Sequence, residues 1–137
     1  MGVLIDASVL IENERGRLDL QRRLSGREDE FFISVVTAGE LLHGVHRAVD
    51  EAVRARRSAW VEAIIVGFPL LPVDLAAARA HAGIRADLAA RGATIGPHDL
   101  WLAAQAIAHG LSLATANARE FARVSALVTE EWGNDAI

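Results

Sequence analysis

The sequence predicts an α/β fold in which helices cover a parallel β-sheet. Short runs of β-branched, leucine or aromatic residues alternate with longer segments of helical periodicity, and such alternation is typical of parallel sheets. The chain has 137 residues, of which 52% are hydrophobic and 23% are charged. This length suits one domain with one sizeable core. We therefore expect residues 1–137 to form a single ordered domain.

Short apolar segments mark the expected strands. The first contains Val3, Leu4 and Ile5, a continuous apolar run of the kind found in fully buried parallel strands. The expected strands are residues 2–6 (GVLID), 31–34 (FFIS), 70–73 (LLPV), 111–115 (LSLAT) and 126–129 (ALVT).

Helices are expected in the segments between these strands. Apolar residues at helical spacing predict the first helix, and an amphipathic pattern predicts the second. Asp74 suits the N-cap of the third helix and Gly92 suits its end. Pro97 and Gly110 bracket the fourth helix with the usual asymmetry. The expected helices are residues 35–48, 50–67, 75–91 and 97–109.

The composition excludes several classes of protein. Cysteine is absent, which excludes disulfides, thiolate metal sites and a cysteine nucleophile. All 14 basic residues are arginines, which excludes lysine chemistry. The start, MGVLIDAS, lacks the basic region of a signal peptide, and the apolar run AWVEAIIVGFPLL is too short to cross a membrane. We expect a cytoplasmic protein that does not bind membranes.

Asp6 is the polar residue that most needs an explanation, because it lies between two apolar runs. A buried carboxylate costs several kcal/mol unless a cation or hydrogen-bond donors offset its charge. Glu40 lies in the first turns of the helix after the second strand, and Asn117 follows the fourth strand. The carboxyl ends of parallel strands share one edge of the sheet, where ligands bind. We therefore expect these three oxygen side chains to converge.

Asp99 lies in the first turn of its helix, and local pattern does not show whether it faces the same cleft. If it does, three carboxylates and an amide surround one small volume. Carboxylates that lie so close together raise one another's pKa unless a cation neutralises them. Oxygen donors without cysteine or a histidine pair at ligand spacing favour Mg²⁺ or Mn²⁺ over Zn²⁺.

Capping is the structural alternative for each of these residues. Glu40 completes a capping-box pattern with Thr37, and the helix dipole favours Asp99 near its helix N-terminus. Asn117 and Glu120 form another cap-like pair.

Four segments of the chain resemble one protein family in order and spacing. They are LIDASVLIE, ISVVTAGELLHGV, IGPHDLWLAAQAIAHGLSLATANAREFARV and the closing L..EEW. Through them the chain, from Gly2 to Trp132, resembles PIN-domain proteins, and specifically the VapC-type toxins of bacterial toxin–antitoxin pairs. The resemblance implies a PIN fold, with a central parallel sheet of about five strands flanked by helices.

The resemblance also implies a metal site. Asp6, Glu40 and Asp99 would be the acidic ligands of Mg²⁺, for which Mn²⁺ can substitute, and Asn117 falls on the family's fourth position. Because an amide brings no charge, we expect a single tightly held ion, with a second arriving with the substrate phosphate.

Three further residues would support that site. Ser8 and Thr115 on local pattern only tie up loop backbone, whereas in the resemblance they orient the carboxylates through hydrogen bonds. Glu120 would supply additional negative charge.

The activity implied is that of a metal-dependent ribonuclease that cuts RNA, often tRNA or rRNA, and so inhibits translation. Asp6, Glu40, Asp99 and Asn117 would be its catalytic residues. The net charge of −4 argues against a protein that coats nucleic acid. The arginines are nevertheless clustered, in residues 15–27 and 54–57. They form either solvated helix faces or local contacts with phosphate groups.

The partners implied are a cognate VapB-like antitoxin, whose C-terminal segment wraps the toxin, and an RNA substrate. A homodimer and a toxin–antitoxin hetero-oligomer are expected, with the apolar LWLAAQAIA helix as either a dimer face or core. Candidate positions for the antitoxin groove are Leu18, Leu41, Leu42, Val45 and Trp60, each of which has core packing as its alternative.

The sequence leaves two other functions open and excludes a third. A non-catalytic PIN module that binds RNA or protein is the main alternative, because Asn117 contributes no charge to the metal site. A structure-specific DNA nuclease is the alternative among enzymes, although 137 residues leave little room for the helical arch of such proteins. A phosphoacceptor signalling domain is excluded, because its acidic pair and late lysine have no counterpart in this chain.

Overall fold

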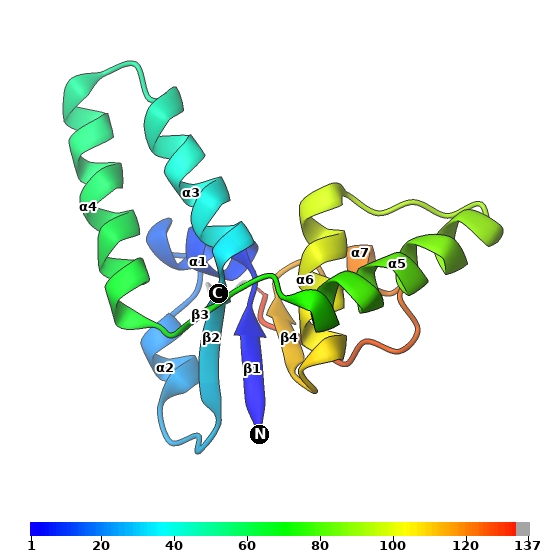
Figure 1. Ribbon diagram of the computed structural model, residues 1–137. Coiled ribbons are helices and arrows are strands. Elements are labelled where there is room, and N and C mark those ends of the chain that lie inside the picture. Colours follow the sequence, from blue (N-terminus) through cyan, green and yellow to red (C-terminus); the bar gives the residue numbers. More distant parts are fainter. Residues whose placement is uncertain (134–137) are drawn as a thin grey trace.

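The computed structural model describes residues 1–133, which fold as a parallel sheet covered by helices on both faces (Figure 1). The expected α/β class and the five-stranded parallel sheet are confirmed, with the spatial order β3-β2-β1-β4-β5. In the centre, Leu4 pairs with Phe32 on one side and with Leu113 on the other. The strands are β1 (Gly2–Ile5), β2 (Glu30–Ser34), β3 (Leu70–Leu71), β4 (Ser112–Thr115) and β5 (Thr129–Glu131).

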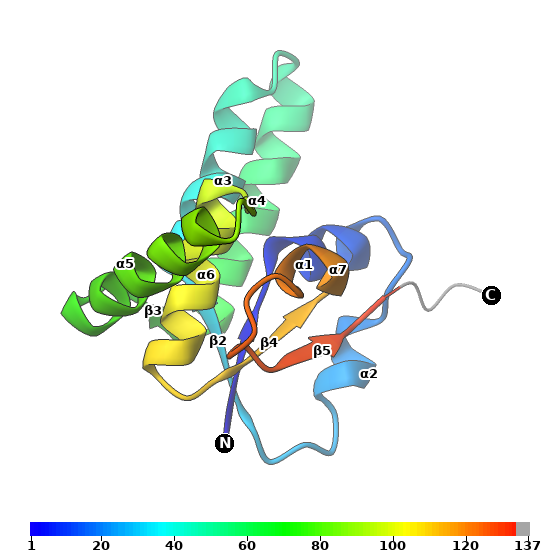
Figure 2. The same ribbon diagram turned by 90° about the vertical axis from the view of Figure 1, so that its right-hand side faces the viewer.

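Helices connect the strands and form the two outer layers. Figure 1 shows α3 and α4 as a hairpin that extends past the carboxyl ends of the strands, with α5 and α6 on the other side. Figure 2 shows α5 crossing α6. The helices are α1 (Ala7–Glu14), α2 (Leu20–Leu24), α3 (Val35–Arg47), α4 (Glu51–Gly67), α5 (Leu75–Ala90), α6 (Pro97–Ala108) and α7 (Ala118–Phe121).

The side chains of β1 alternate between two apolar cores, as the pleat of a strand requires. Val3 and Ile5 pack with residues of α1, α3 and α4 on one face of the sheet. Leu4 packs with residues of α6 and with Phe121 on the other face. Because the strand is covered on both faces, its sequence is continuously apolar. Within the described residues, none of the helices has both the length and the apolar composition of a membrane-spanning segment.

The edge strands differ from their expected limits. The third strand was expected at residues 70–73 but ends at Leu71, because Pro72 has no N–H to continue the ladder. The fifth was expected at residues 126–129, whereas β5 begins at Thr129 and carries two glutamates. An edge strand tolerates such charges, so the apolar pattern placed it too early.

Three short helices, α1, α2 and α7, were not expected. The apolar run after Asp6 is the start of α1, whose Val9 and Leu10 are buried. The capping-box interpretation of Thr37 is also wrong. The N-cap of α3 is Ser34, whose Oγ accepts a hydrogen bond of 3.0 Å from the backbone N–H of Val36.

A buried glutamine joins α6 to the sheet. Gln105 is fully buried, and its Oε1 accepts a hydrogen bond of 2.5 Å from Ser34 Oγ. Its Nε2 donates to the carbonyl oxygens of Leu71 and Pro72, each at 3.1 Å. One side chain therefore fixes α6 against the ends of β2 and β3, which sets where the first turn of α6 lies.

We expect Gln105→Leu to lower the free energy of unfolding by about 2–4 kcal/mol, because it leaves buried carbonyl and hydroxyl groups without partners. Urea unfolding followed by circular dichroism measures the change. Gln21→Leu, at an exposed position of α2, is the matched control. Equal unfolding midpoints for Gln105→Leu and wild type would contradict this account of the helix.

Candidate active site

Asp6 lies at the carboxyl end of β1, where it occupies the N-cap position of α1. The residue is only 6% exposed. Its Oδ2 accepts a hydrogen bond of 2.7 Å from Ser8 Oγ and one of 2.8 Å from Thr115 Oγ1. These hydroxyl groups offset part of the cost of burying the carboxylate, and they leave the other oxygen, Oδ1, without a protein donor among residues 1–133.

Ser8 and Thr115 also hold the loop that follows β4. Ser8 Oγ accepts from the backbone N–H of Ala116 at 3.0 Å, and Thr115 Oγ1 accepts from the backbone N–H of Asn117 at 2.9 Å. The two hydroxyl oxygens are 3.3 Å apart. The same two side chains therefore have both of the roles expected from the sequence. They support the loop backbone, and they orient the carboxylate of Asp6.

The other acidic residues come from three helices. Glu40 lies on α3, Asp99 in the first turn of α6 and Glu120 in α7. Burial, together with the negative charges of Asp6, Glu40 and Glu120, raises the pKa of Asp99 to about 6. Asp99 therefore faces the same small region as the other acids, a placement that local sequence pattern left open.

Glu40 is coupled to the same group of charges. Burial raises its pKa, the positive charge of a protonated His98 lowers it, and the charge of Asp6 raises it. Nδ1 of His98 lies 3.3 Å from Oε2 of Glu40. The two residues come from α3 and α6, so this contact closes one side of the site.

Asn117 is less closely integrated. It is exposed at the N-cap position of α7, but its side chain makes no capping hydrogen bond, so the cap-like pairing with Glu120 is wrong. Its links to the site are through the backbone: its N–H donates to Thr115 Oγ1, and its carbonyl oxygen accepts from the N–H of Glu120.

The acidic residues fit a divalent cation in their chemistry. The donors are all oxygen atoms. Burial, and after it the repulsion among these acids, raises the pKa values of Glu40 and Asp99, and a bound cation would offset both effects. As the side chains stand, no three histidine or acidic groups within residues 1–133 meet closely enough to ligate one ion.

A pocket of about 600 Å³ opens between α3 and α6 beside these acids. Glu40 and His98 form its near side, and Trp101 and Arg47 also line it. Trp101 and Arg47 were not among the residues expected at the site. The available signal was helical spacing, because Trp101 follows His98 by three residues and Arg47 follows Glu40 by seven.

The expected apolar groove for a partner is only partly exposed. Leu18 is 3% exposed and Leu41 is 7% exposed, so both are core residues and the expectation for them is wrong. Leu42 is 37% exposed, whereas Val45 and Trp60 are half-buried. A pocket of about 180 Å³ between α1, α3 and α4 is lined by Trp60 and arginine side chains.

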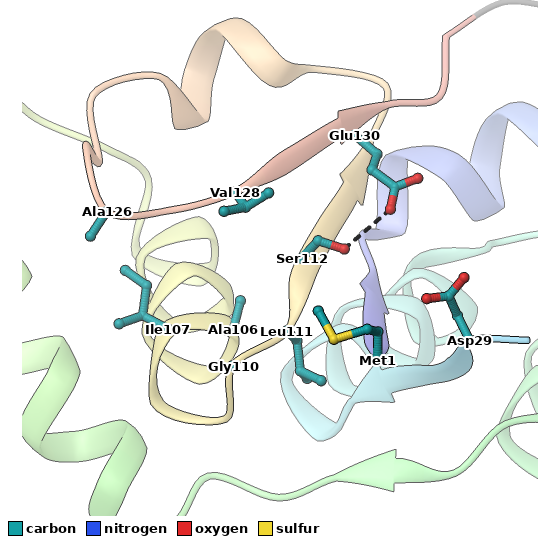
Figure 3. A pocket seen from close by; sticks show the side chains of 11 residues that line it. Met1, Asp29, Ala106, Ile107, Gly110, Leu111, Ser112, Ala126, Val128 and Glu130 are labelled. Atoms are coloured by element: carbon teal, nitrogen blue, oxygen red, sulfur yellow. Dashed lines mark hydrogen bonds between the residues drawn. The ribbon is translucent and has the colours of Figure 1, made fainter.

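A further pocket, of about 420 Å³, lies at the opposite edge of the sheet (Figure 3). Its floor is apolar, and Glu130 is at its rim, where it accepts a hydrogen bond of 3.2 Å from Ser112. Both carboxylate oxygens of Glu130 also bond to Arg27, at 2.7 and 3.0 Å. This pocket therefore lacks the unpaired acids that mark the carboxyl edge.

Comparisons with known proteins show the family to which the chain belongs. The sequence matches the PIN domain family over residues 3–127. It is 36% identical to ribonuclease VapC1 of Rickettsia felis over 127 residues, 93% of each chain. It is 32% identical to the tRNA(fMet)-specific endonuclease VapC of Shigella flexneri over 130 residues, 94% of this chain and 96% of that one.

A solved structure is similar in fold as well as in sequence. It is that of VapBC-5 from Mycobacterium tuberculosis, a member of the VapBC family of toxin–antitoxin systems, and one of its chains superposes with a TM-score of 0.77 at 35% identity. The match covers 94% of this chain and 95% of that one. The chain therefore belongs to the PIN domain family and, within it, to the VapC-type proteins.

Proposed function

We propose that this chain is a single-domain, metal-dependent endoribonuclease, the toxin of a toxin–antitoxin pair, acting in the cytoplasm. The observation that carries the proposal is the gathering of Asp6, Glu40 and Asp99 at the carboxyl edge of the sheet, where the pKa of Asp99 rises to about 6. The relatives named ribonuclease VapC1 and tRNA(fMet)-specific endonuclease support RNA as the substrate. Hydrolysis of tRNA or rRNA would inhibit translation.

The protein's own groups would hold and orient the ion. Asp6, Glu40 and Asp99 would be ligands of Mg²⁺ or Mn²⁺, Asn117 would offer an amide oxygen, and Glu120 would add negative charge. Ser8 and Thr115 fix Oδ2 of Asp6 through hydrogen bonds, so Oδ1 would be the oxygen available to a cation. When bound, a divalent cation activates water for in-line attack on a phosphodiester and stabilises the charge on its oxygens.

Two of the clustered arginines are already bonded to other groups of the protein. Arg27 is committed to Glu130 and Asp29, and both Nε and Nη2 of Arg54 donate to the Ala48 carbonyl oxygen. These two are therefore poor candidates for binding RNA.

Three other arginines lie next to Glu40. Arg15, Arg47 and Arg57 line the small pocket between α1, α3 and α4 together with Glu40. They would attract the phosphates that the acids repel.

A VapB-like antitoxin is the proposed protein partner, supported by the similarity to a VapBC toxin–antitoxin structure. Its segment would lie on Trp60 and Leu42, the more accessible apolar positions around α3 and α4. We also propose a homodimer and a hetero-oligomer with the antitoxin. Leu102, Ala103 and Ala106 of α6 are fully buried in the core, so a dimer face would use other residues of that helix.

A non-catalytic RNA-binding module is the second candidate. It is favoured by one observation, that no three acidic or histidine groups in the described part of the chain lie close enough together to hold one metal ion. Activity measurements separate the two functions.

We expect purified, antitoxin-free protein to cut end-labelled tRNA or rRNA into discrete fragments in Mg²⁺ or Mn²⁺ and to be inactive in EDTA. Asp6→Asn and Asp99→Asn should each lower the rate by at least about a hundredfold, because each removes charge that would hold the cation. Asp87→Asn, on the exposed side of α5, is the matched control and should cut normally.

Two outcomes would contradict the ribonuclease proposal. Fragments that persist in EDTA and in both variants would show a metal-independent or contaminating activity. If folded wild type and variants bind RNA equally and none cuts tRNA, rRNA or a DNA control, the binding-module function is the better one.

We expect Asp99→Asn to stabilise the metal-free protein at neutral pH. The pKa of Asp99 is about 6 in the folded chain, above its usual value, so the folded state binds the proton more tightly than the unfolded state does. The free energy of unfolding therefore falls as pH rises from about 4 to about 6. Asp99→Asn has no carboxyl group at this position, so its free energy of unfolding does not fall in this way. After allowance for solvent screening, we expect the variant to be more stable than wild type at about pH 7 by on the order of 1 kcal/mol.

Urea unfolding in EDTA at about pH 4 and at about pH 7 measures this difference. The two proteins should be close in stability at the lower pH, and Mg²⁺ at neutral pH should stabilise wild type more than Asp99→Asn. A variant that is no more stable than wild type at neutral pH in EDTA would contradict the proposed repulsion.

A further inference from the structure

The pocket between α3 and α6 begins at the proposed catalytic acids. Its volume is about 600 Å³, and Glu40 and His98 belong to its wall. Since Nδ1 of His98 contacts Oε2 of Glu40 at 3.3 Å, the acids and the pocket share one boundary. A group held in this pocket therefore lies directly beside a phosphodiester that is held at the acids.

An aromatic ring forms part of the pocket wall and is fixed in place. Trp101 of α6 is half-buried, and its ring stacks on His81 of α5 with centroids 3.8 Å apart and planes inclined by 25°. Burial and the neighbouring Arg85 lower the pKa of His81, which keeps the imidazole neutral at physiological pH. The two rings form an uncharged stack, and such rigid aromatic surfaces are the platforms on which unpaired bases stack.

The same pocket also carries positive charge. Glu40, His43 and Arg47 are spaced for one face of α3, and all three line the pocket. Arg47 is exposed, and the structure pairs it with no carboxylate within residues 1–133. From Glu40 to Arg47 the helix rises by about 10 Å, so a guanidinium lies at one end of the pocket and the acids lie at the other.

We propose that this pocket is a nucleotide subsite, in which an unpaired base of the RNA stacks on Trp101 and an adjacent phosphate contacts Arg47. The inference rests on the proposed ribonuclease function and assigns the side chains that would hold a nucleotide beside the acids. A base in an A-form duplex is stacked and paired, so it cannot enter such a pocket, whereas a loop base can turn out of its strand.

A glycine provides a way to close the pocket without removing any of its groups. A Cβ atom added to Gly39, which lines the pocket, would meet no other atom within 4 Å. A larger side chain there would occupy the space proposed for the base. Gly83 of α5 is also inside a helix with open space around it, and it does not line this pocket. Gly39→Leu and Gly83→Leu are therefore a matched pair that both improve helix propensity.

The test measures binding of a fluorescently labelled single-stranded RNA oligonucleotide, and of the same oligonucleotide without bases, in EDTA so that neither is cut. Wild type and Gly83→Leu should bind the normal oligonucleotide roughly tenfold more tightly than the abasic one. Gly39→Leu and Trp101→Leu should lose this preference, whereas Trp101→Phe should keep most of it because an aromatic platform remains.

The phosphate contact has a separate signature. Arg47→Gln should weaken binding of both oligonucleotides equally and reduce the slope of log affinity against log salt by about one. Arg79→Gln, at an exposed position of α5, should change neither quantity.

Several results would overturn the subsite. One is equal affinity of wild type for the two oligonucleotides, and another is an undiminished preference of Gly39→Leu for the normal oligonucleotide over the abasic one. A third is no binding of either RNA, which would point to a protein segment as the occupant. If Trp101→Leu does not fold, Gly39→Leu decides, because it adds atoms instead of removing them.

Failure of the subsite and failure of the ribonuclease function are distinguishable. Cleavage by wild type together with an unchanged base preference in Gly39→Leu refutes the subsite alone. A base preference in EDTA without cleavage in Mg²⁺ or Mn²⁺ refutes the nuclease alone.

Discussion

Repulsion among carboxylates at one edge of the sheet is the constraint on which the rest of this structure depends. Asp6 is buried at the end of a fully apolar strand, and burial together with the charge of Asp6 raises the pKa of both Glu40 and Asp99. In a metal-free chain this arrangement disfavours the folded state at neutral pH. It persists because the hydroxyl groups of Ser8 and Thr115 bond to Asp6 and because helices from both layers hold the other acids nearby.

The opposite edge shows how the same fold treats a carboxylate that has a structural role. Glu130 accepts hydrogen bonds from both Nη atoms of Arg27, and further ones from Ser112 and Trp132. These donors, Arg27 first, lower the pKa of Glu130 to about 2, against the effect of burial. Arg27 therefore neutralises Glu130 at one edge, whereas at the other edge Asp6 and Asp99 form no ion pair within residues 1–133. This contrast, more than the acids themselves, indicates a ligand site at the carboxyl edge.

The parts of the fold that follow from hydrophobic periodicity could be predicted from the sequence, and they include β1 and the four longer helices. The placement of β5 could not, because charged residues are acceptable on an edge strand and the apolar signal lies before it. Asp6 was recognisable as an acid between apolar runs. The position of Asp99 was not, because it depends on how α6 is fixed to the sheet, in which Gln105 has a large part. The stack of His81 on Trp101 joins two helices, and no local pattern encodes such a contact.

The most direct test of the central claim is the pKa of Asp99 in the metal-free protein, measured by NMR titration of its side-chain carboxyl carbon. The account predicts a midpoint near 6, a clear fall toward the usual range in Asp6→Asn, and a fall in wild type when Mg²⁺ is added. An ordinary midpoint near 3.8 that responds neither to Asp6→Asn nor to Mg²⁺ would show that these acids do not form one electrostatic unit. The proposed cation site would then lose its physical basis.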